Sequence, residues 1–320
     1  MVPKQTDVAV VGSANVDLVA TVAALPRPGE TVAAVDYTQF LGGKGSNQAV
    51  AAARLGRKVA FVGLVGEDAE AALVRESLDA EGVDTEHLRA AAGEPTGRAV
   101  VLVDAAAENS IVIVAGANGR LAPEHVRAAA ATVSAASVVV TQLEVPVDTV
   151  LEAARTCRGR FILNPAPAPD PDAPLPRELL DLVDVLVVNE IEYEAVTGRP
   201  LPDDPAALAS ELAADAALPA ALVITAGERG ALVWDGVLTE IPAPRVDVVD
   251  TTGAGDTFIG ALADALSREV PLVEAARWAV HAAAISVGSL GATTGMPRRE
   301  AVETSVRGHG TPPGPSHEEE

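Results

Sequence analysis

The segment VDVVDTTGAGDTFIGALADAL, residues 246–266, decides the fold class of this chain. An apolar run typical of a strand leads through Gly253 and Gly255 into a helix with one apolar face. Outward from this segment, apolar runs of strand length alternate with helical patterns along most of the chain. Strand–helix alternation predicts an α/β fold, with a mostly parallel sheet covered by helices on both sides.

The expected strands are apolar at consecutive positions, which is typical of strands covered on both faces. They are residues 7–12, 58–66, 137–144, 160–165, 184–190 and 220–236. The expected helices between them are residues 46–57, 68–82, 123–136 and 204–218. Residues 14–41 and 96–115 alternate in part and have no helix between their strands, which predicts a small separate sheet. The Gly-, Pro- and acid-rich residues 305–320 predict a disordered tail after a folded domain of residues 1–304.

Composition excludes several classes of protein. The chain has 320 residues and a formal net charge of -22, which disfavours nonspecific nucleic-acid binding and an anionic membrane surface. Its single cysteine, Cys157, allows neither a disulfide framework nor a cysteine metal cluster. No apolar run is long enough to span a membrane and the N-terminus lacks a signal-peptide pattern, so we expect a cytoplasmic protein.

Polar residues follow many of the expected strands. Five such clusters lie at residues 12–17, 142–144, 164–165, 189–190 and 225–227. Asn, Gly and Ser are common turn residues, so a single cluster indicates only a turn. Because the carboxyl ends of parallel strands share one edge of a sheet, five clusters together predict a single binding cleft there.

The G-A-G-D run at residues 253–256 predicts an anion site. Backbone N–H groups of Gly253, Ala254 and Gly255 add to the positive end of the following helix, as in sites that stabilise a transferring phosphoryl group. Asp256 is then placed to take a proton from an attacking alcohol. The alternative is a simple N-cap by Asp256 or Thr252, although a cap does not need the preceding glycines.

A second Gly-rich run, FLGGKGSNQAVAAARLG at residues 40–56, predicts close approach of the backbone to a small polar ligand. The alternative is a simple loop-to-helix entry capped by Ser46 or Asn47. Uncharged or acidic side chains that suit the hydroxyls of a polyol are Asn15, Asp17, Asn47 and Glu144. They would repel a phosphorylated acceptor, so we expect the acceptor to be a small neutral molecule.

Seven segments resemble the ribokinase family of sugar kinases over about the first 300 residues. They are GSANVDL (12–18), PRPGET (26–31), GGKGSNQAVAAARLG (42–56), QLEVP (142–146), NPAPA (164–168), NEIE (189–192) and DTTGAGDTF (250–258). The resemblance implies a Rossmann-like three-layer sandwich with a small β-sheet lid, and often a homodimer paired through the lids. It also implies ATP-dependent phosphorylation of D-ribose at the 5-hydroxyl.

The resemblance also implies roles for individual residues. The catalytic group is Asp256 as base with the anion hole of Gly253, Ala254, Gly255 and Asp256. The sugar is held by Ser13, Asn15, Asp17, Gly42, Gly43, Lys44, Asn47 and Glu144. The nucleotide is held by Asn189, Thr225, Gly227, Glu228, Arg229, Gly230, Gly255 and His281. Glu192 organises Mg²⁺ through water, and the K⁺ site is Asp250, Thr252, Ser286, Ser289, Gly291 and Gly295. At the last position, family members carry a serine, and Gly295 cannot supply its hydroxyl.

Other functions stay open at this point. A sister kinase acting on deoxyribose, fructose or adenosine has the same motifs, although the 2% aromatic content disfavours a nucleoside, whose base needs stacking partners. A non-catalytic sugar sensor on the same fold would not need the acid of G-A-G-D. A dinucleotide-dependent oxidoreductase needs three spaced glycines, which the run GSANVD lacks.

Overall fold

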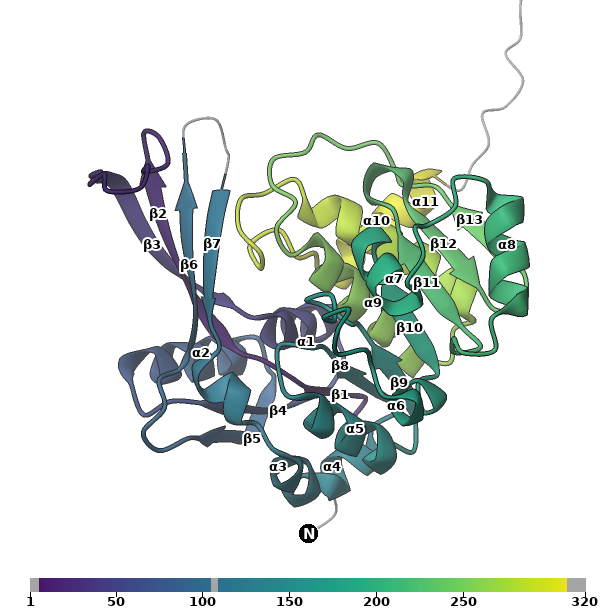
Figure 1. Ribbon diagram of the computed structural model, residues 1–320, viewed down its shortest axis with the longest axis horizontal. Coiled ribbons are helices and arrows are strands. Elements are labelled where there is room, and N and C mark those ends of the chain that lie inside the picture. The colour runs from purple at the N-terminus through teal and green to yellow at the C-terminus, as the bar shows by residue number, and fades with distance from the viewer. Residues whose placement is uncertain (1–5, 105–108, 310–320) are drawn as a thin grey trace, which may run out of the picture.

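The computed structural model describes residues 6–104 and 109–309 and contains two sheets (Figure 1). The large sheet has nine strands in the order β13-β12-β11-β10-β9-β8-β1-β4-β5. These are β1 (Val8–Val11), β4 (Val59–Val65), β5 (Asp84–Ala90), β8 (Val138–Thr141), β9 (Arg160–Leu163), β10 (Val185–Val188), β11 (Leu222–Thr225), β12 (Ala231–Trp234) and β13 (Leu238–Ile241). All neighbours from β11 to β5 run parallel, and β12 and β13 add an antiparallel edge. The predicted α/β class is therefore confirmed.

Helices cover both faces of the large sheet. One face is covered by helices that include α1 (Lys44–Arg54), α9 (Ala254–Ser267) and α10 (Leu272–Ser286). The other face is covered by α3 (Pro123–Ala128), α4 (Ala130–Ala135), α5 (Val147–Thr156), α6 (Arg177–Asp181), α7 (Glu190–Thr197) and α8 (Pro205–Ala214). The remaining helices are α2 (Ala69–Ala80), α11 (Arg299–His309) and the 3₁₀ turns η1 (Gly116–Arg120) and η2 (Gly227–Arg229).

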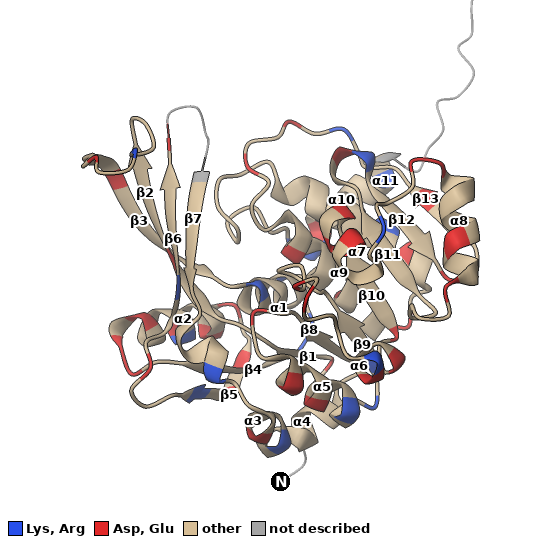
Figure 2. Cartoon of the chain, viewed as in Figure 1, with Lys and Arg blue, Asp and Glu red and all other residues tan. Residues whose placement is uncertain are grey.

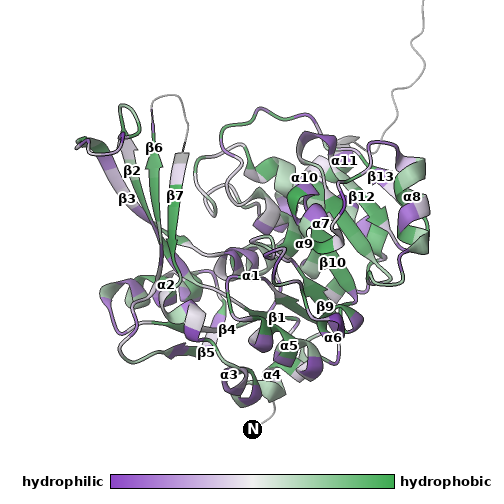
Figure 3. Cartoon of the chain, viewed as in Figure 1, coloured by the Kyte–Doolittle hydropathy of each residue, from purple (hydrophilic) through white to green (hydrophobic). Residues whose placement is uncertain are grey.

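Strand β1 shows how the core is divided. Its residues alternate between the two core clusters: Val8 and Val10 pack toward α1 and α9, whereas Ala9 and Val11 pack toward the opposite layer. All four are fully buried, which explains why the strand is apolar at every position. In Figure 3 the hydrophobic colouring accordingly follows inner strands of the large sheet such as β1 and β10, whereas the edge strand β5 is largely hydrophilic.

Helices α1 and α9 pack unusually closely at Gly260. A Cβ atom added at Gly260 would lie 2.5 Å from Ala51 Cβ and 2.7 Å from the carbonyl oxygen of Gln48. Only glycine allows the two helix backbones to approach this far without displacing one of them. The contact fixes the spacing between the start of α9 and the residues of α1 that face it.

The small sheet has four strands in the order β3-β2-β6-β7 and projects beside the main body (Figure 1). They are β2 (Asn15–Val22), β3 (Ala34–Gly42), β6 (Gly97–Val103) and β7 (Asn109–Val114). Strands β2 and β6 are parallel, and the other pairs are antiparallel. β7 exposes both of its faces: Ile111, Val112, Ile113 and Val114 are 54, 62, 54 and 42% exposed.

Several local expectations differ from the structure. Residues 246–250 are irregular and form no strand, and residues 220–236 form two antiparallel strands, β11 and β12, joined by η2. The expected helix 123–136 is divided into α3 and α4 at Ala129. Helix α11 ends at His309, so it extends into the segment expected to be a tail, and residues 310–320 lie outside the described residues.

The described surface fits the acidic composition. In the view of Figure 2, Lys and Arg residues are scattered singly among Asp and Glu, without a basic stripe. No helix in the described ranges is both long enough and apolar enough to cross a lipid bilayer.

Candidate active site

The site lies where β1 and β8 end side by side at the carboxyl edge of the large sheet. After β1 the chain moves toward β4, and after β8 it moves toward β9, so the strand order reverses between them. Ligands of open α/β sheets bind at such a switch point. Here Ser13 Oγ donates a hydrogen bond of 2.5 Å to Glu144 Oε2, and the Lys44 amide donates to the same oxygen at 3.0 Å. Three sequence motifs therefore meet at one carboxylate.

The first turn of α1 packs directly on the turn between β1 and β2. Gly43 has a φ of 92° at the N-cap of α1, and a Cβ atom there would lie 2.8 Å from the Asn15 amide nitrogen. A side chain at this position is excluded by both backbone conformation and contact. The close approach brings Asn47 and Gln48 of α1 to the start of α9.

Asp256 lies in the first turn of α9 and is only 8% exposed. Its Oδ2 accepts a hydrogen bond of 2.9 Å from Asn47 Nδ2, and its Oδ1 accepts one of 3.0 Å from Gln48 Nε2. Burial raises the pKa of Asp256; Lys44 and the two amide donors oppose that rise, and the Glu144 carboxylate adds to it. A buried carboxylate with a raised pKa and fixed orientation is suited to accept a proton.

The glycines before Asp256 shape the start of α9. Gly253 is the N-cap with a φ of 76°, and a Cβ atom there would lie 2.5 Å from the carbonyl oxygen of Ala292. At Gly255 an added Cβ would meet no atom within 4 Å, so the space above it is open. The Ala254 amide donates to the Thr251 carbonyl at 3.1 Å, which directs one of the four predicted anion-hole amides into the turn itself.

A cavity of about 230 Å³ lies between the start of α9 and the ends of β9, β10 and β11. It is lined by Lys44, Asn164, Ala166, Val187, Val188, Asn189, Glu192, Thr225, Gly253, Gly255, Asp256 and Ile259. The cavity therefore brings together the predicted base, two of the anion-hole glycines and residues from the predicted nucleotide set.

Asn189 and Glu192 form a capping box at the start of α7. Asn189 Oδ1 accepts from the Glu192 amide at 2.8 Å, and Glu192 Oε2 accepts from the Asn189 amide at 3.0 Å. Asn164 Nδ2 also donates to Glu192 Oε2 at 3.3 Å. Burial raises the pKa of Glu192, while hydrogen bonds from Asn189 and Asn164 and the charge of Lys44 oppose the rise. Glu192 is thus held rigidly by its neighbours.

The turn from Thr225 to Gly230 is divided between two environments. Thr225 lines the cavity, and its hydroxyl donates to the Val188 carbonyl at 3.3 Å. Arg229 instead forms an ion pair with Glu190 and does not line that cavity, and Glu228 is exposed. Gly227 and Gly230 have positive φ angles of 55° and 96°, which the tight reversal between β11 and β12 requires.

Asp17 is the second titratable acid on the sugar side of the predicted site. Burial, followed by the charges of Glu144 and Asp256, raises the pKa of Asp17 from 3.8 to about 6. A Cβ atom at Gly42 would lie 2.0 Å from Asp17 Oδ1, so the glycine makes room for the carboxylate. Asn15 is held nearby because its Oδ1 accepts from Asn118 Nδ2 at 2.7 Å.

The residues predicted to hold K⁺ converge in part. Asp250 Oδ1 accepts from the amide and hydroxyl of Thr252 at 2.9 and 2.6 Å, and its Oδ2 accepts from the Gly291 amide at 2.8 Å. Burial raises the pKa of Asp250, but these hydrogen bonds outweigh it and lower the pKa overall. A Cβ atom at Gly295 would lie 2.1 Å from the Ser286 carbonyl oxygen, so no side chain fits there.

Two predicted residues are less closely connected to the rest. Ser289 lies half-buried in the loop that Gly291 ties to Asp250. His281 is buried in α10, where its Nδ1 lies 2.8 Å from Ser305 Oγ of α11, and it does not line the cavity around Asp256.

Sequence reasoning gave no role to two amide side chains of the site, Gln48 and Asn118, and both are buried. Gln142 and Asn164 belong to the strand-end clusters that were predicted to face the cleft, but neither side chain was given a role of its own. Gln48 lies within the second Gly-rich run, whereas Asn118 follows the small sheet in η1. The sequence does contain a signal for Gln48, because it shares one face of α1 with Ala51 and Ala52, and a face with several alanines is expected to be buried.

A three-layer α/β domain, a small second sheet and a buried acid at a glycine-preceded helix define the carbohydrate kinase class. The family model described as "pfkB family carbohydrate kinase" matches residues 5–299, and the chain belongs to this family. The predicted family resemblance is therefore confirmed.

Curated relatives and solved structures support the same placement. The chain is 40% identical over 303 residues to "Ribokinase" of Bacillus subtilis, covering 93% of this chain and 98% of that protein. It is 37% identical over 299 residues to "Deoxyribokinase" of Salmonella typhi, covering 92% and 96%. The structure titled "Arabidopsis thaliana Ribokinase complexed with Ribose and ATP" superposes with a TM-score of 0.86 at 35% identity, covering 95% of this chain and 99% of the other.

Proposed function

We propose that this protein is a ribokinase, which transfers the γ-phosphoryl group of ATP to the 5-hydroxyl of D-ribose. The observation that carries the proposal is the placement of Asp256, held by Asn47 and Gln48 in a cavity that also contains Gly253 and Gly255. Curated relatives named ribokinase, identical at 34 to 40% over more than nine tenths of the chain, support ribose as the acceptor.

The chemistry follows from this arrangement. Asp256 takes the proton of the 5-hydroxyl as the ribose oxygen forms a bond to the γ-phosphorus, and the bond from phosphorus to the ADP oxygen breaks. The leaving ADP retains the electron pair. The N-terminal amides of α9 and the Lys44 ammonium stabilise the negative charge on the transferring group.

The acceptor side is formed by uncharged and acidic groups. Glu144 accepts hydrogen bonds from the Ser13 hydroxyl and the Lys44 backbone amide. Asn15 and Asp17 lie at the start of β2 in the small sheet. Asn47 Oδ1 is buried without a hydrogen-bond partner in the described structure, so it offers an acceptor to a ribose hydroxyl. Gly42 and Gly43 allow the sugar to approach the backbone closely.

The nucleotide side is formed by Asn189, Thr225 and the turn through Gly230. No group of three or more His, Cys, Asp or Glu residues in the described ranges is arranged to hold a metal ion. Glu192 would hold Mg²⁺ through water, and the bound ion would neutralise negative charge on the ATP phosphates. Arg229 would first have to leave Glu190 to reach a phosphate.

We further propose that K⁺ binds beside the anion hole. The lowered pKa of Asp250 keeps its carboxylate ionised, which fits a monovalent cation. Thr252, Ser286, Ser289 and Gly291 would add backbone oxygens. Because Gly295 excludes a side chain, this site has one hydroxyl fewer than the family pattern, and the backbone must supply that ligand or leave the position to water.

A second candidate acceptor is 2-deoxyribose. A relative named deoxyribokinase is 37% identical over 92% of this chain, close to the identity of the ribokinases. The two sugars differ in one hydroxyl, and loss of a hydrogen bond to a site built for it costs a large factor in specificity.

The test is ADP release by the purified protein with Mg-ATP and ribose, deoxyribose, fructose or adenosine, each with and without K⁺. The proposal expects ribose to give the highest kcat/KM and K⁺ to increase it. A preference for deoxyribose would move the assignment to the second candidate. Equal rates with and without K⁺ would contradict the cation site alone, and ribose binding without turnover would indicate a sugar sensor.

We also propose a cytoplasmic homodimer paired through the small sheets. Strand β7 exposes four consecutive apolar side chains, and Val35 and Tyr37 of β3 are 78 and 55% exposed. Such an apolar strand face is normally covered in solution. Light scattering should give twice the 32.5 kDa chain mass, and Val112→Lys should convert the protein to a monomer.

A further inference from the structure

Four buried amide side chains form a connected network beneath Asp256. Its members are Asn47 and Gln48 of α1, Gln142 after β8 and Asn164 after β9. Gln48 and Gln142 are completely buried, and Asn47 and Asn164 are 5 and 8% exposed. Amide groups are costly to bury unless they are hydrogen-bonded, so a buried cluster of four requires an explanation beyond packing.

The direction of each amide is fixed by neighbours that cannot donate. An ionised Asp256 only accepts, so Gln48 must present Nε2 to it, at 3.0 Å. Gln48 Oε1 then faces Gln142 and accepts from Gln142 Nε2 at 2.6 Å. At the other end Asn164 Nδ2 donates to the Val187 carbonyl at 3.1 Å, which turns its Oδ1 toward Gln48 Nε2 at 3.5 Å.

Gln142 has no direct contact with Asp256 in this network. Its other amide atom, Oε1, is buried without a hydrogen-bond partner in the described structure. A Cβ atom at Gly12 would lie 2.1 Å from that oxygen, so a glycine leaves room for the glutamine. A buried acceptor without a partner destabilises the fold, and an apolar side chain would fill the same space without that cost. The contribution of Gln142 is therefore its hydrogen bond to Gln48.

We propose that Gln142 and Gln48 are positioning residues for the phosphoryl-transfer reaction. Gln142 holds the Gln48 amide in the orientation that presents its N–H to Asp256, and this N–H keeps the carboxylate aligned and ionised for proton abstraction. The inference rests on the proposed kinase function, because it assigns Asp256 the role of base. The hydrogen bond from Gln48 opposes the rise of the Asp256 pKa that burial causes, as does the one from Asn47.

The kinetic test uses four variants and the pH dependence of kcat/KM for ribose. Gln48→Met removes the donor itself and is expected to lower kcat/KM at pH 7 by about tenfold to hundredfold, the usual effect of losing one hydrogen bond to a charged group. The acid limb of its pH profile of kcat/KM should move to higher pH by about one unit. Gln142→Met should shift the limb in the same direction by less, although residue 142 has no hydrogen bond to Asp256.

The matched control is Thr141→Val. Thr141 is adjacent to Gln142 and fully buried, and its hydroxyl has no hydrogen-bond partner in the described structure. Its substitution should leave the pH profile unchanged. The double variant Gln48→Met/Gln142→Met should resemble Gln48→Met alone, because Gln142 acts only through Gln48. Additive effects, or a Gln142→Met profile that matches Thr141→Val, would overturn the proposal.

A second measurement does not depend on turnover. Burial places the pKa of Asp256 above its unfolded value, and loss of the Gln48 donor raises it further, so the added instability exists only where Asp256 is ionised. The difference in unfolding temperature between wild type and Gln48→Met should therefore widen as the pH rises through the range in which Asp256 ionises. For Thr141→Val it should stay constant.

The two measurements separate the two proposals. If the wild type does not phosphorylate ribose, the proposed function fails, and the unfolding temperatures still decide whether Gln48 stabilises the Asp256 carboxylate. If the wild type is active, the positioning role alone fails under two joint results. The acid limb of Gln48→Met lies at the same pH as that of wild type, and its difference in unfolding temperature from wild type does not change with pH.

Discussion

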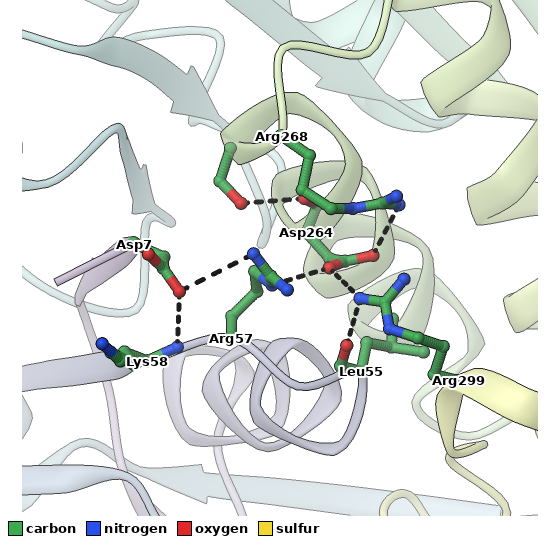
Figure 4. Close-up of polar contacts among 8 residues, drawn as sticks. Asp7, Leu55, Arg57, Lys58, Asp264, Arg268 and Arg299 are labelled. Atoms are coloured by element: carbon green, nitrogen blue, oxygen red, sulfur yellow. Dashed lines mark hydrogen bonds and ion pairs between the residues drawn. The ribbon is translucent and has the colours of Figure 1, made fainter.

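Helix α9 carries a buried acid near each end, and their surroundings are opposite. Asp256, in the first turn, is contacted by the neutral amides of Asn47 and Gln48. Asp264, in the last turns, is fully buried among three guanidinium groups (Figure 4). Arg299 Nη2 lies 2.7 Å, Arg57 Nε 3.0 Å and Arg268 Nη2 3.1 Å from its carboxylate oxygens.

The arginines around Asp264 tie distant parts of the chain together. Arg57 follows α1 and also pairs with Asp7 at 3.7 Å, and Arg299 opens α11 and donates to the Leu55 carbonyl. Arg268 and Arg299 each lie 5.5 Å from the ring centre of Trp278. The Arg57 Nε approaches Asp264 closely but is not aligned for a hydrogen bond, so this contact is chiefly electrostatic.

Burial alone therefore does not make a carboxylate reactive. At Asp264, cations compensate the buried charge, and the carboxylate serves to hold α1, α9 and α11 together. At Asp256, the Lys44 charge and the two neutral donors compensate the burial only in part, so the pKa stays raised and the group retains its tendency to bind a proton. One helix thus carries a proposed catalytic base, Asp256, and a structural carboxylate, Asp264.

The strongest test of this contrast is Asp256→Asn. We expect kcat for ribose to fall by about 10²- to 10⁴-fold, the contribution of a general base. The unfolding temperature at pH 8 should not fall, because the substitution removes a buried charge whose raised pKa marks it as unfavourable. Steady-state kinetics and thermal unfolding on the same preparation test this; a large loss of stability would show that the Asp256 carboxylate also holds the fold together.

Asp264→Asn should give the reverse pattern. Removing the carboxylate leaves three guanidinium groups around a neutral side chain, and we expect unfolding to become easier by about 3–5 kcal/mol. Denaturant unfolding measures this loss. The kcat of the protein that remains folded at low temperature should stay within a few-fold of wild type. A severe kcat defect without loss of stability would show that the two ends of α9 do not divide these roles.

Asp17 is a third acid with a perturbed environment, and its pKa, raised by burial from 3.8 to about 6, falls within the working pH range. We expect the KM for ribose to rise as pH falls through about 6, since a protonated carboxyl loses acceptor capacity. Asp17→Asn should have a raised KM that no longer varies across this range. Because the pKa of Asp17 is raised, its ionisation costs more free energy in the folded protein than in the unfolded chain. This cost is present at pH 8, where Asp17 is ionised in both states, and is small at pH 3.5. Asp17→Asn should therefore also raise the unfolding temperature at pH 8 and not at pH 3.5.

The smallest effect is expected for Arg268→Met. The Arg268 side chain is 33% exposed, and Asp264 keeps its contacts with Arg57 and Arg299. A partly exposed ion pair contributes at most about 1 kcal/mol, so the unfolding free energy should change by no more than that. Methionine keeps the aliphatic contact, and activity should not change. A loss comparable to that of Asp264→Asn would show that the three arginines act as one unit.

The sequence predicted the layers of the fold because buried parallel strands are apolar at every position. It failed at elements without that pattern. β5 carries the polar run Asp84–Ala90 at the edge of the sheet, and α11 has little apolar content. Residues 246–250 look like a strand because Val246, Val248 and Val249 are apolar, yet these three are 43–62% exposed.

The site was predictable where a motif carries charge and glycine. Asp256, Glu144 and Lys44 lie together as the motifs imply. The contacts of the amides were not predictable: the strand-end clusters placed Gln142 and Asn164 at the cleft, but nothing local pairs Gln48 with Asp256, 208 positions away in the chain. Asn118 was hidden for the same reason: its partners Ala14 and Asn15 are more than 100 residues distant.

The close contact at Gly260 has a consequence for anyone who redesigns this protein. Replacing a helix glycine by alanine ordinarily stabilises a helix by about 1 kcal/mol, and sequence-based stabilisation would select this position first. Here a single added methyl group would press on Ala51 and on the Gln48 carbonyl. It would act as a wedge between α1 and α9, one turn from Asp256. The protein would gain helix propensity and lose the alignment of the two side chains on which its proposed chemistry depends.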